Sequence, residues 1–152
     1  SQMDKVDRQI ARILLQDART PFSTIAKKID MSTSNVIKRY RSLKKDKFFL
    51  RSSITVDPRK LGYNANAMVY ITTALGTKIS DIHKRILKIP NVIILVKVLG
   101  DCDMMAIIPL KTFEDLFEIE EIFRRMDDIK NIQIKINPPF INWPFDFFAA
   151  LL

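Results

Sequence analysis

Apolar side chains in the first third of the chain recur every three or four residues, which is the spacing of one face of an α-helix. Three such runs predict three helices, at about 4–17, 21–29 and 33–46. Thr20 and Ser32 are residue types that cap helix N-termini, and Pro21 suits a first helical position. Three short helices with a tight turn at 30–32 predict a helix-turn-helix, winged-helix-like module.

The pattern changes in the next part of the chain. Residues 50–56 alternate loosely between apolar and polar side chains, which predicts a strand. Asp57-Pro58 and Leu61-Gly62 then give turn signals. We therefore expect a β hinge or linker at 50–62, between two modules of different character.

The second half alternates β-prone runs with runs of helical spacing. We predict strands at about 64–75, 91–100, 103–110 and 129–137, and helices at about 79–89 and 113–126. Thr112 is expected to cap the later helix. The order β-α-β-β-α-β is that of the ferredoxin-like arrangement. Because both helices would cover one face of the sheet, the other face should be solvated or buried against a partner.

The end of the chain, 138–152, is rich in proline and aromatic residues and too short for a domain. Its aromatic side chains are Phe140, Trp143, Phe145, Phe147 and Phe148. Leaving each in water would cost roughly 1.5–3 kcal/mol. We expect this tail to pack on its own domain or on a second subunit, and a partly ordered tail is the alternative.

Charge is distributed unevenly between the two halves. Residues 1–60 contain 15 Lys and Arg against 6 Asp and Glu, a balance of +9, whereas residues 61–152 contain 10 against 11, a balance of −1. A basic module of this kind favours a polyanion as its partner. On charge alone, a Lys-rich surface that only keeps the protein in solution is the alternative.

The helix expected at 33–46 has two distinct sides. Val36, Tyr40 and Leu43 fall together on a helical wheel as a buried seam. The opposite side carries only hydroxyl, amide and cationic groups, those of Ser34, Asn35, Lys38, Arg41, Ser42 and Lys45. Such groups contact phosphates and base edges in the DNA major groove. A merely solvated helix usually mixes both signs of charge, so the pattern predicts a helix that reads double-stranded DNA.

Four stretches in combination resemble the Lrp/AsnC family, the leucine-responsive or feast/famine transcription regulators. They are MDKVDRQIARILLQDAR, TIAKKIDMSTSNVIKRYRSLKK, DPRKLGY and VLGDCDMMAII, and the resemblance covers residues 3–137. It implies an N-terminal helix-turn-helix, a β-strand hinge and a C-terminal ferredoxin-like domain. That domain dimerises in the family, often assembles further, and in many members binds an amino acid between dimers.

By this resemblance the helix at 33–46 is the recognition helix. The candidate DNA contacts on this helix and its cap are Ser32, Thr33, Ser34, Asn35, Lys38, Arg39, Arg41, Ser42 and Lys45. The resemblance also places the effector pocket beside a loop formed by Gly100, Asp101, Cys102 and Asp103. Without the resemblance, a plain hairpin turn would be the simpler interpretation of that loop.

The chain departs from the family pattern at four positions. Asp30 and Lys47 stand where the family often has Gly, and the second change predicts a different turn at 47–49. Ile132 and Ile134 stand where the last strand of the family commonly carries Thr, near the effector pocket. These apolar side chains favour an apolar amino acid as effector, or none.

Residues for catalysis are scarce in this sequence. His83 is the only histidine, Cys102 has no base beside it, and three glycines make no phosphate-cradling loop. We therefore expect no enzyme activity, no cofactor and no metal site. Two alternatives are an enzyme on the same scaffold acting on a tetrapyrrole, as in the sirohaem decarboxylases, and an oligomerising sensor without DNA contact. The single His83 and the +9 module, respectively, argue against them.

We therefore expect an α+β regulator that binds a pseudo-palindromic DNA site as a homodimer or a higher assembly, such as a tetramer or octamer. Its expected parts are a DNA-binding domain, a hinge, an oligomerisation and effector domain, and a tail, at 3–49, 50–62, 63–137 and 138–152. No apolar run is long enough to cross a membrane and no signal peptide is evident. We expect a cytoplasmic protein, because the single Cys102 gives no sign of secretion.

Overall fold

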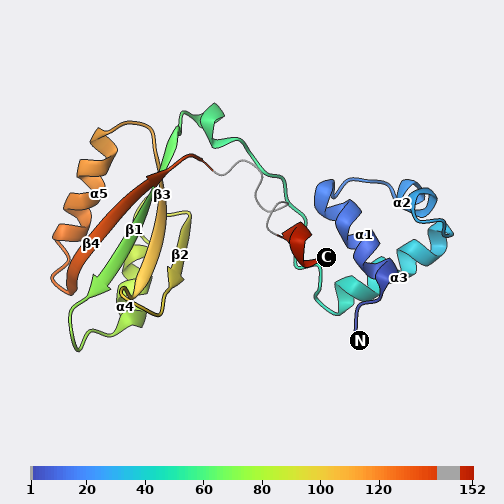
Figure 1. The fold of residues 1–152 in the computed structure, drawn as a ribbon, viewed down its shortest axis with the longest axis horizontal. Helices are drawn as coiled ribbons and strands as arrows, with labels where there is room; N and C mark the ends of the chain where they lie inside the picture. Colours follow the sequence, from blue (N-terminus) through green and yellow to red (C-terminus); the bar gives the residue numbers. More distant parts are fainter. Residues whose placement is uncertain (1, 140–147) are drawn as a thin grey trace. The chain divides into compact units, whose positions relative to one another are not determined.

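The computed structural model describes residues 2–139 and 148–152 of the chain. These residues divide into two compact units (Figure 1). The described residues of 1–56 and of 148–152 belong to the first unit, and residues 57–139 form the second. The division lies inside the segment where the sequence pattern changes.

The first unit contains three helices, α1 (Lys5–Gln16), α2 (Phe22–Lys28) and α3 (Thr33–Lys45), as the apolar spacing predicts. Its core consists of four buried side chains: Ile10, Ile25, Ala26 and Val36. No strand occurs among the described residues of this unit, so that its helices are not followed by a β wing in the single chain.

Two of the three helices in the first unit begin with a side-chain cap. The Ser32 hydroxyl accepts a hydrogen bond from the Asn35 N–H at 3.3 Å, which confirms the predicted cap of α3. The predicted Thr20 cap of α2 is wrong, because the Thr20 hydroxyl donates to the Asp17 carbonyl at 2.7 Å. Pro21 precedes α2 instead, without a side-chain cap.

The second unit is a four-stranded antiparallel sheet with the order β2-β3-β1-β4 (Figure 1). Its strands are β1 (Ala65–Thr73), β2 (Ile94–Lys97), β3 (Met104–Leu110) and β4 (Ile129–Asn137). Its helices are α4 (Ile79–Ile86) and α5 (Glu114–Arg124), after a short 3-10 turn at Pro58–Leu61. This order confirms the predicted ferredoxin-like arrangement.

Both helices of the second unit pack on the same face of the sheet. Alternate residues of β1 and β3, among them Val69 and Ala106, share one buried cluster with Ile82 of α4 and Phe123 of α5. The residues between them belong to the opposite face, since side chains alternate along a strand. No described helix contributes to that opposite face, which is therefore the open face of the sheet.

The start of α5 differs from the sequence prediction. Thr112 is not its cap, because Phe113 occupies the cap position. The Asp115 carboxylate accepts hydrogen bonds from the N–H groups of Lys111 and Thr112, at 2.7 and 3.0 Å. A charged carboxylate makes stronger hydrogen bonds to these donors than a hydroxyl would.

The strand predicted at 50–56 is not formed in the single chain. Residues 50–57 have no regular secondary structure, and Leu50 and Ile54 are 86% and 80% exposed. A strand requires hydrogen bonds to a neighbouring strand, and no described strand pairs with this segment. The alternating pattern therefore identified a β-prone segment but not a formed hinge strand.

Part of the predicted tail lies outside the described residues. These are positions 140–147, which include Phe140, Trp143, Phe145 and Phe147. Phe148 is described and precedes a short 3-10 helix, Ala149–Leu151. The predicted packing of the aromatic tail therefore stays a prediction.

Candidate nucleic-acid interface

The turn between α2 and α3 is closed by a backbone motif. Asp30 follows α2 in the left-handed conformation, with φ 54°, and the Met31 N–H donates to the Ala26 carbonyl at 2.9 Å. This bond is the signature of a Schellman end, which usually has Gly at the left-handed position. The turn brings Ser32 directly to the start of α3.

The inner side of α3 is held by its predicted seam. Val36 and Leu43 are buried, and Tyr40 is half-buried. The Tyr40 ring lies 5.0 Å from the ring of Phe22 and stacks on Phe49 at 5.5 Å, centroid to centroid. These contacts attach α3 to α2 and to the chain that follows it, so that the opposite side of α3 faces solvent.

The outer side of α3 carries most of the candidate DNA contacts. The exposed ones are Ser32, Thr33, Ser34, Asn35, Lys38, Arg41, Ser42 and Lys45. No acidic residue occurs between Thr33 and Lys45. This surface offers hydroxyl, amide and cationic groups to a ligand, which are the groups that contact DNA phosphates and base edges.

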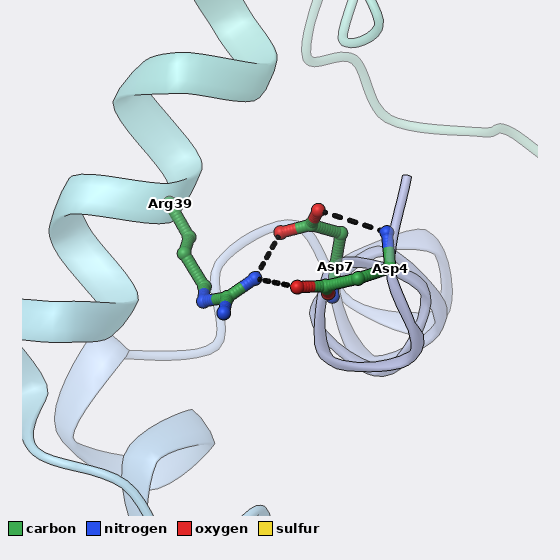
Figure 2. A network of polar contacts seen from close by, with 3 residues as sticks. All are labelled: Asp4, Asp7 and Arg39. Atoms are coloured by element: carbon green, nitrogen blue, oxygen red, sulfur yellow. Dashed lines mark hydrogen bonds and ion pairs between the residues drawn. The ribbon is translucent and has the colours of Figure 1, made fainter. Parts of the chain in front are cut away.

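Arg39 differs from the other candidate contacts. It is only half exposed, and its guanidinium Nη1 lies 2.6 Å from Asp4 Oδ2 and 2.9 Å from Asp7 Oδ1 (Figure 2). Its pKa is raised mainly by these two hydrogen bonds. The Asp7 backbone N–H, and then Arg39, hold the pKa of the Asp4 carboxyl below its ordinary value. Sequence reasoning grouped Arg39 with the DNA contacts and missed its two partners on α1.

The candidate effector loop is only partly available to a ligand. Gly100 and Asp101 are exposed, whereas Cys102 is buried, and burial is the largest cause that raises the pKa of its thiol. The Asp103 carboxylate accepts hydrogen bonds from the N–H and the hydroxyl of Thr73, at 2.7 and 2.9 Å. Only two of the four predicted residues therefore present accessible groups at this loop in the single chain.

The last strand places Ile132 and Ile134 on the helix-covered face, where they pack against the core. Ile71 pairs with Met104 on one side and with Ile132 on the other. Because Met104 directly follows the candidate effector loop, this loop and Ile132 lie at the same end of the sheet.

An apolar hollow of about 420 Å³ beside α5 was not expected from the sequence. Its lining residues are Phe113, Leu116, Phe117, Glu120, Ile134 and Ile136. Phe113 and Phe117 are 78% and 71% exposed, although both share the helical spacing of the buried Phe123. An aromatic stripe alone does not show which of its members the sheet covers.

Residues 2–139 and 148–152 contain neither a candidate metal site nor a candidate membrane-spanning helix. No group of three or more His, Cys, Asp or Glu side chains there could hold a metal ion. None of the helices in the same residues has the length and apolar character needed to cross a lipid bilayer.

A helix-turn-helix unit with a basic outer helix face, joined to a ferredoxin-like unit, defines a class of DNA-binding regulators. A family model described as the AsnC-type helix-turn-helix domain matches residues 3–44. The transcriptional regulator LrpA of Pyrococcus horikoshii is 33% identical over 117 residues, which cover 77% of this chain and 82% of the relative. The chain belongs to the Lrp/AsnC family of transcription regulators.

Solved structures show the same fold. AsnC of E. coli superposes with a TM-score of 0.83 at 19% identity, over 92% of this chain and 97% of AsnC. A transcriptional regulator of Neisseria meningitidis, solved as a complex with L-Met, gives a TM-score of 0.82 at 14% identity and covers 99% of this chain and all of its own. The relatives are named as regulators, which gives no support to the tetrapyrrole alternative.

Proposed function

We propose that the protein binds a pseudo-palindromic DNA site as a dimer, with the outer side of α3 in the major groove. The observation that carries this proposal is the exposed, acid-free face of α3, fixed at its start by the Ser32 cap. A two-fold dimer would present two such helices, so that half-sites should lie about one helical turn, or a multiple of it, apart. We further propose that the protein acts by binding and not by catalysis.

The open face of the sheet is the proposed dimer contact. Side chains there include Met68, Tyr70 and Met105, which alternate with core residues along β1 and β3. An apolar face without a covering layer favours burial against a second copy. Higher assembly, to a tetramer or octamer, is consistent with this arrangement but depends on further contacts.

An effector, where one acts, would bind beside Gly100 and Asp101 at a contact between dimers. The L-Met bound by the Neisseria regulator supports an amino acid as its class. The apolar Ile132 at the same end of the sheet favours an apolar amino acid over a charged one. Calorimetry that detected tight binding of Lys, Arg or Glu would contradict this assignment.

The proposed DNA contact is tested by the double variant Lys38→Ala, Arg41→Ala. A duplex is first selected from random DNA by the wild-type protein, and its affinity is then measured by mobility shift at several salt concentrations. Neither side chain lies in the buried seam, so that folding and oligomer size should not change. The slope of log affinity against log salt should fall by about 0.9 for each DNA phosphate that the variant no longer neutralises.

The matched control is Lys84→Ala, Lys88→Ala, which removes two exposed positive charges from the second unit. This control should leave the affinity and the salt slope near their wild-type values. Unchanged affinity and slope in the Lys38→Ala, Arg41→Ala variant would show that α3 is a solvated surface helix.

A further inference from the structure

Arg39 lies on the side of α3 that faces the start of α1. It follows Val36 by three residues and Asn35 by four, which places it between the buried seam and the Asn35 edge of the proposed DNA face. Figure 2 shows the guanidinium extending to the first turn of α1, where Nη1 donates to Asp4 at 2.6 Å and to Asp7 at 2.9 Å. The contact therefore joins α1 and α3 through residues that are more than 30 positions apart in sequence.

Both carboxylates are themselves fixed to the backbone of α1. Asp4 Oδ1 accepts from the Asp7 N–H at 2.8 Å, and Asp7 Oδ2 accepts from the Asp4 N–H at 3.2 Å. Each carboxylate thus uses one oxygen for this capping box and the other for Arg39. The guanidinium is consequently held against the backbone of α1, and not against two freely rotating side chains.

A contact at the flank of a helix can restrain the rotation of that helix about its own axis. Side-chain atoms lie about 5–6 Å from a helix axis, so that a rotation of about 10° moves them by about 1 Å. A shift of that size is enough to weaken a hydrogen bond to a base edge. The apolar core of this unit is small, with Val36 as the α3 member of its buried cluster. A polar contact at the flank of α3 can therefore contribute substantially to fixing the orientation of this helix.

We propose that Arg39 is a positioning residue for DNA recognition, which sets the rotation of α3 by its bonds to Asp4 and Asp7 and does not itself contact DNA. This inference rests on the proposed DNA-binding function. The competing assignment is that Arg39 leaves the carboxylates and binds a DNA phosphate. When the carboxylates lose their charge, the positioning role predicts weaker discrimination between DNA sequences. The phosphate-binding role predicts tighter binding of any duplex.

The variants are Arg39→Met, Arg39→Lys and the double variant Asp4→Asn, Asp7→Asn. Asn is a good N-cap, so that the double variant should keep α1 while it loses both negative charges. Lys44→Met is the matched control, because it removes one exposed positive charge from the same helix. Affinity for the selected duplex and for an unrelated duplex of equal length is measured across salt, at a temperature where circular dichroism shows every variant folded.

Positioning predicts a loss of discrimination. Arg39→Met and the double Asn variant should each lower the ratio of selected to unrelated affinity by about tenfold, the order of one base contact. The salt slope should stay at its wild-type value, and Arg39→Lys should fall between Met and wild type, because its ammonium can still bond a carboxylate. Lys44→Met should leave the ratio unchanged.

Two results would overturn the inference. A salt slope that falls by about 0.9 in Arg39→Met, together with tighter binding of both duplexes by the Asn variant, would make Arg39 a phosphate contact. An unchanged ratio in all variants would make the contact with α1 irrelevant to recognition. A wild-type protein that does not discriminate between duplexes would instead contradict the proposed function itself. If Arg39→Met failed to fold, the Asn variant would still decide between the two assignments.

Discussion

Two residues in the first unit adopt a backbone conformation that suits glycine. Lys47 follows α3 with φ 57°, and the Phe48 N–H donates to the Leu43 carbonyl at 2.9 Å. The helix thus ends in a Schellman motif, so that the different turn expected from the Lys47 substitution does not occur. Asp30 does the same after α2, but a short polar side chain tolerates this conformation better than Lys does.

The strain at Lys47 leads to a stability prediction. Lys47→Gly should stabilise the first unit by about 0.5–1 kcal/mol, because relief of left-handed strain exceeds the entropy that Gly loses on folding. The measurement is chemical denaturation followed by circular dichroism. Lys44→Gly, in the last turn of α3, is the control and should destabilise by up to about 1 kcal/mol. A lower stability for Lys47→Gly would contradict the strain argument.

At the scale of elements, the Asp103 carboxylate ties the start of β3 to the end of β1. It bonds the N–H and the hydroxyl of Thr73, and these bonds hold its pKa below the ordinary value. The lowered pKa means that the ionised Asp103 carboxylate is more stable in the folded state than in the unfolded state. The contribution to stability is therefore present above about pH 4 and is lost as the pH falls through the lower, folded pKa.

The variant Asp103→Asn tests this pH dependence. At neutral pH it should lower the free energy of unfolding by about 1–2 kcal/mol, the size of a charge-assisted hydrogen bond. Below pH 4 the difference from wild type should shrink, because Asp103 takes up a proton in the unfolded state first and in the folded state only at its lowered pKa. Denaturation curves at several pH values measure both effects. A difference that stays constant down to pH 2 would show that the ionised carboxylate is not the stabilising form.

The sequence predicted those elements whose determinants are local. The helices, the inner seam of α3 and the Ser32 cap follow from spacing and residue type, and each is confirmed. The sequence alone could not show whether residues 50–56 form a strand, because strand formation depends on a partner strand. The bonds of Arg39 to Asp4 and Asp7 could not be predicted for a related reason, since these residues are distant from Arg39 in sequence and become its neighbours only in the folded unit.

At the scale of the whole molecule, the open face of the sheet leads to an assembly prediction. Met105→Glu places a charge on that face, where burial without a partner would be unfavourable. Light scattering should show wild type above the monomer mass of 17.7 kDa and the variant shifted towards it. DNA affinity should fall as well, because the second half-site would no longer be bound by a linked helix.

The control for this prediction is Thr112→Glu, which adds the same charge at an exposed position next to α5. Its assembly state should match wild type. A wild-type protein that remained a 17.7 kDa monomer at micromolar concentration would contradict the proposed dimer contact.

Residues 50–57 matter for the range of sites that such a dimer can use. An unpaired segment of eight residues can span at most about 25–30 Å. When one DNA-reading unit is bound, such a tether would keep the second at an effective concentration near the millimolar range over that radius. The DNA spacer between the two half-sites could then change in length during evolution while both half-sites are still bound. DNA affinity that persists when base pairs are inserted between the half-sites would show that this segment is a flexible tether. Affinity that is lost would show that it is a rigid linker.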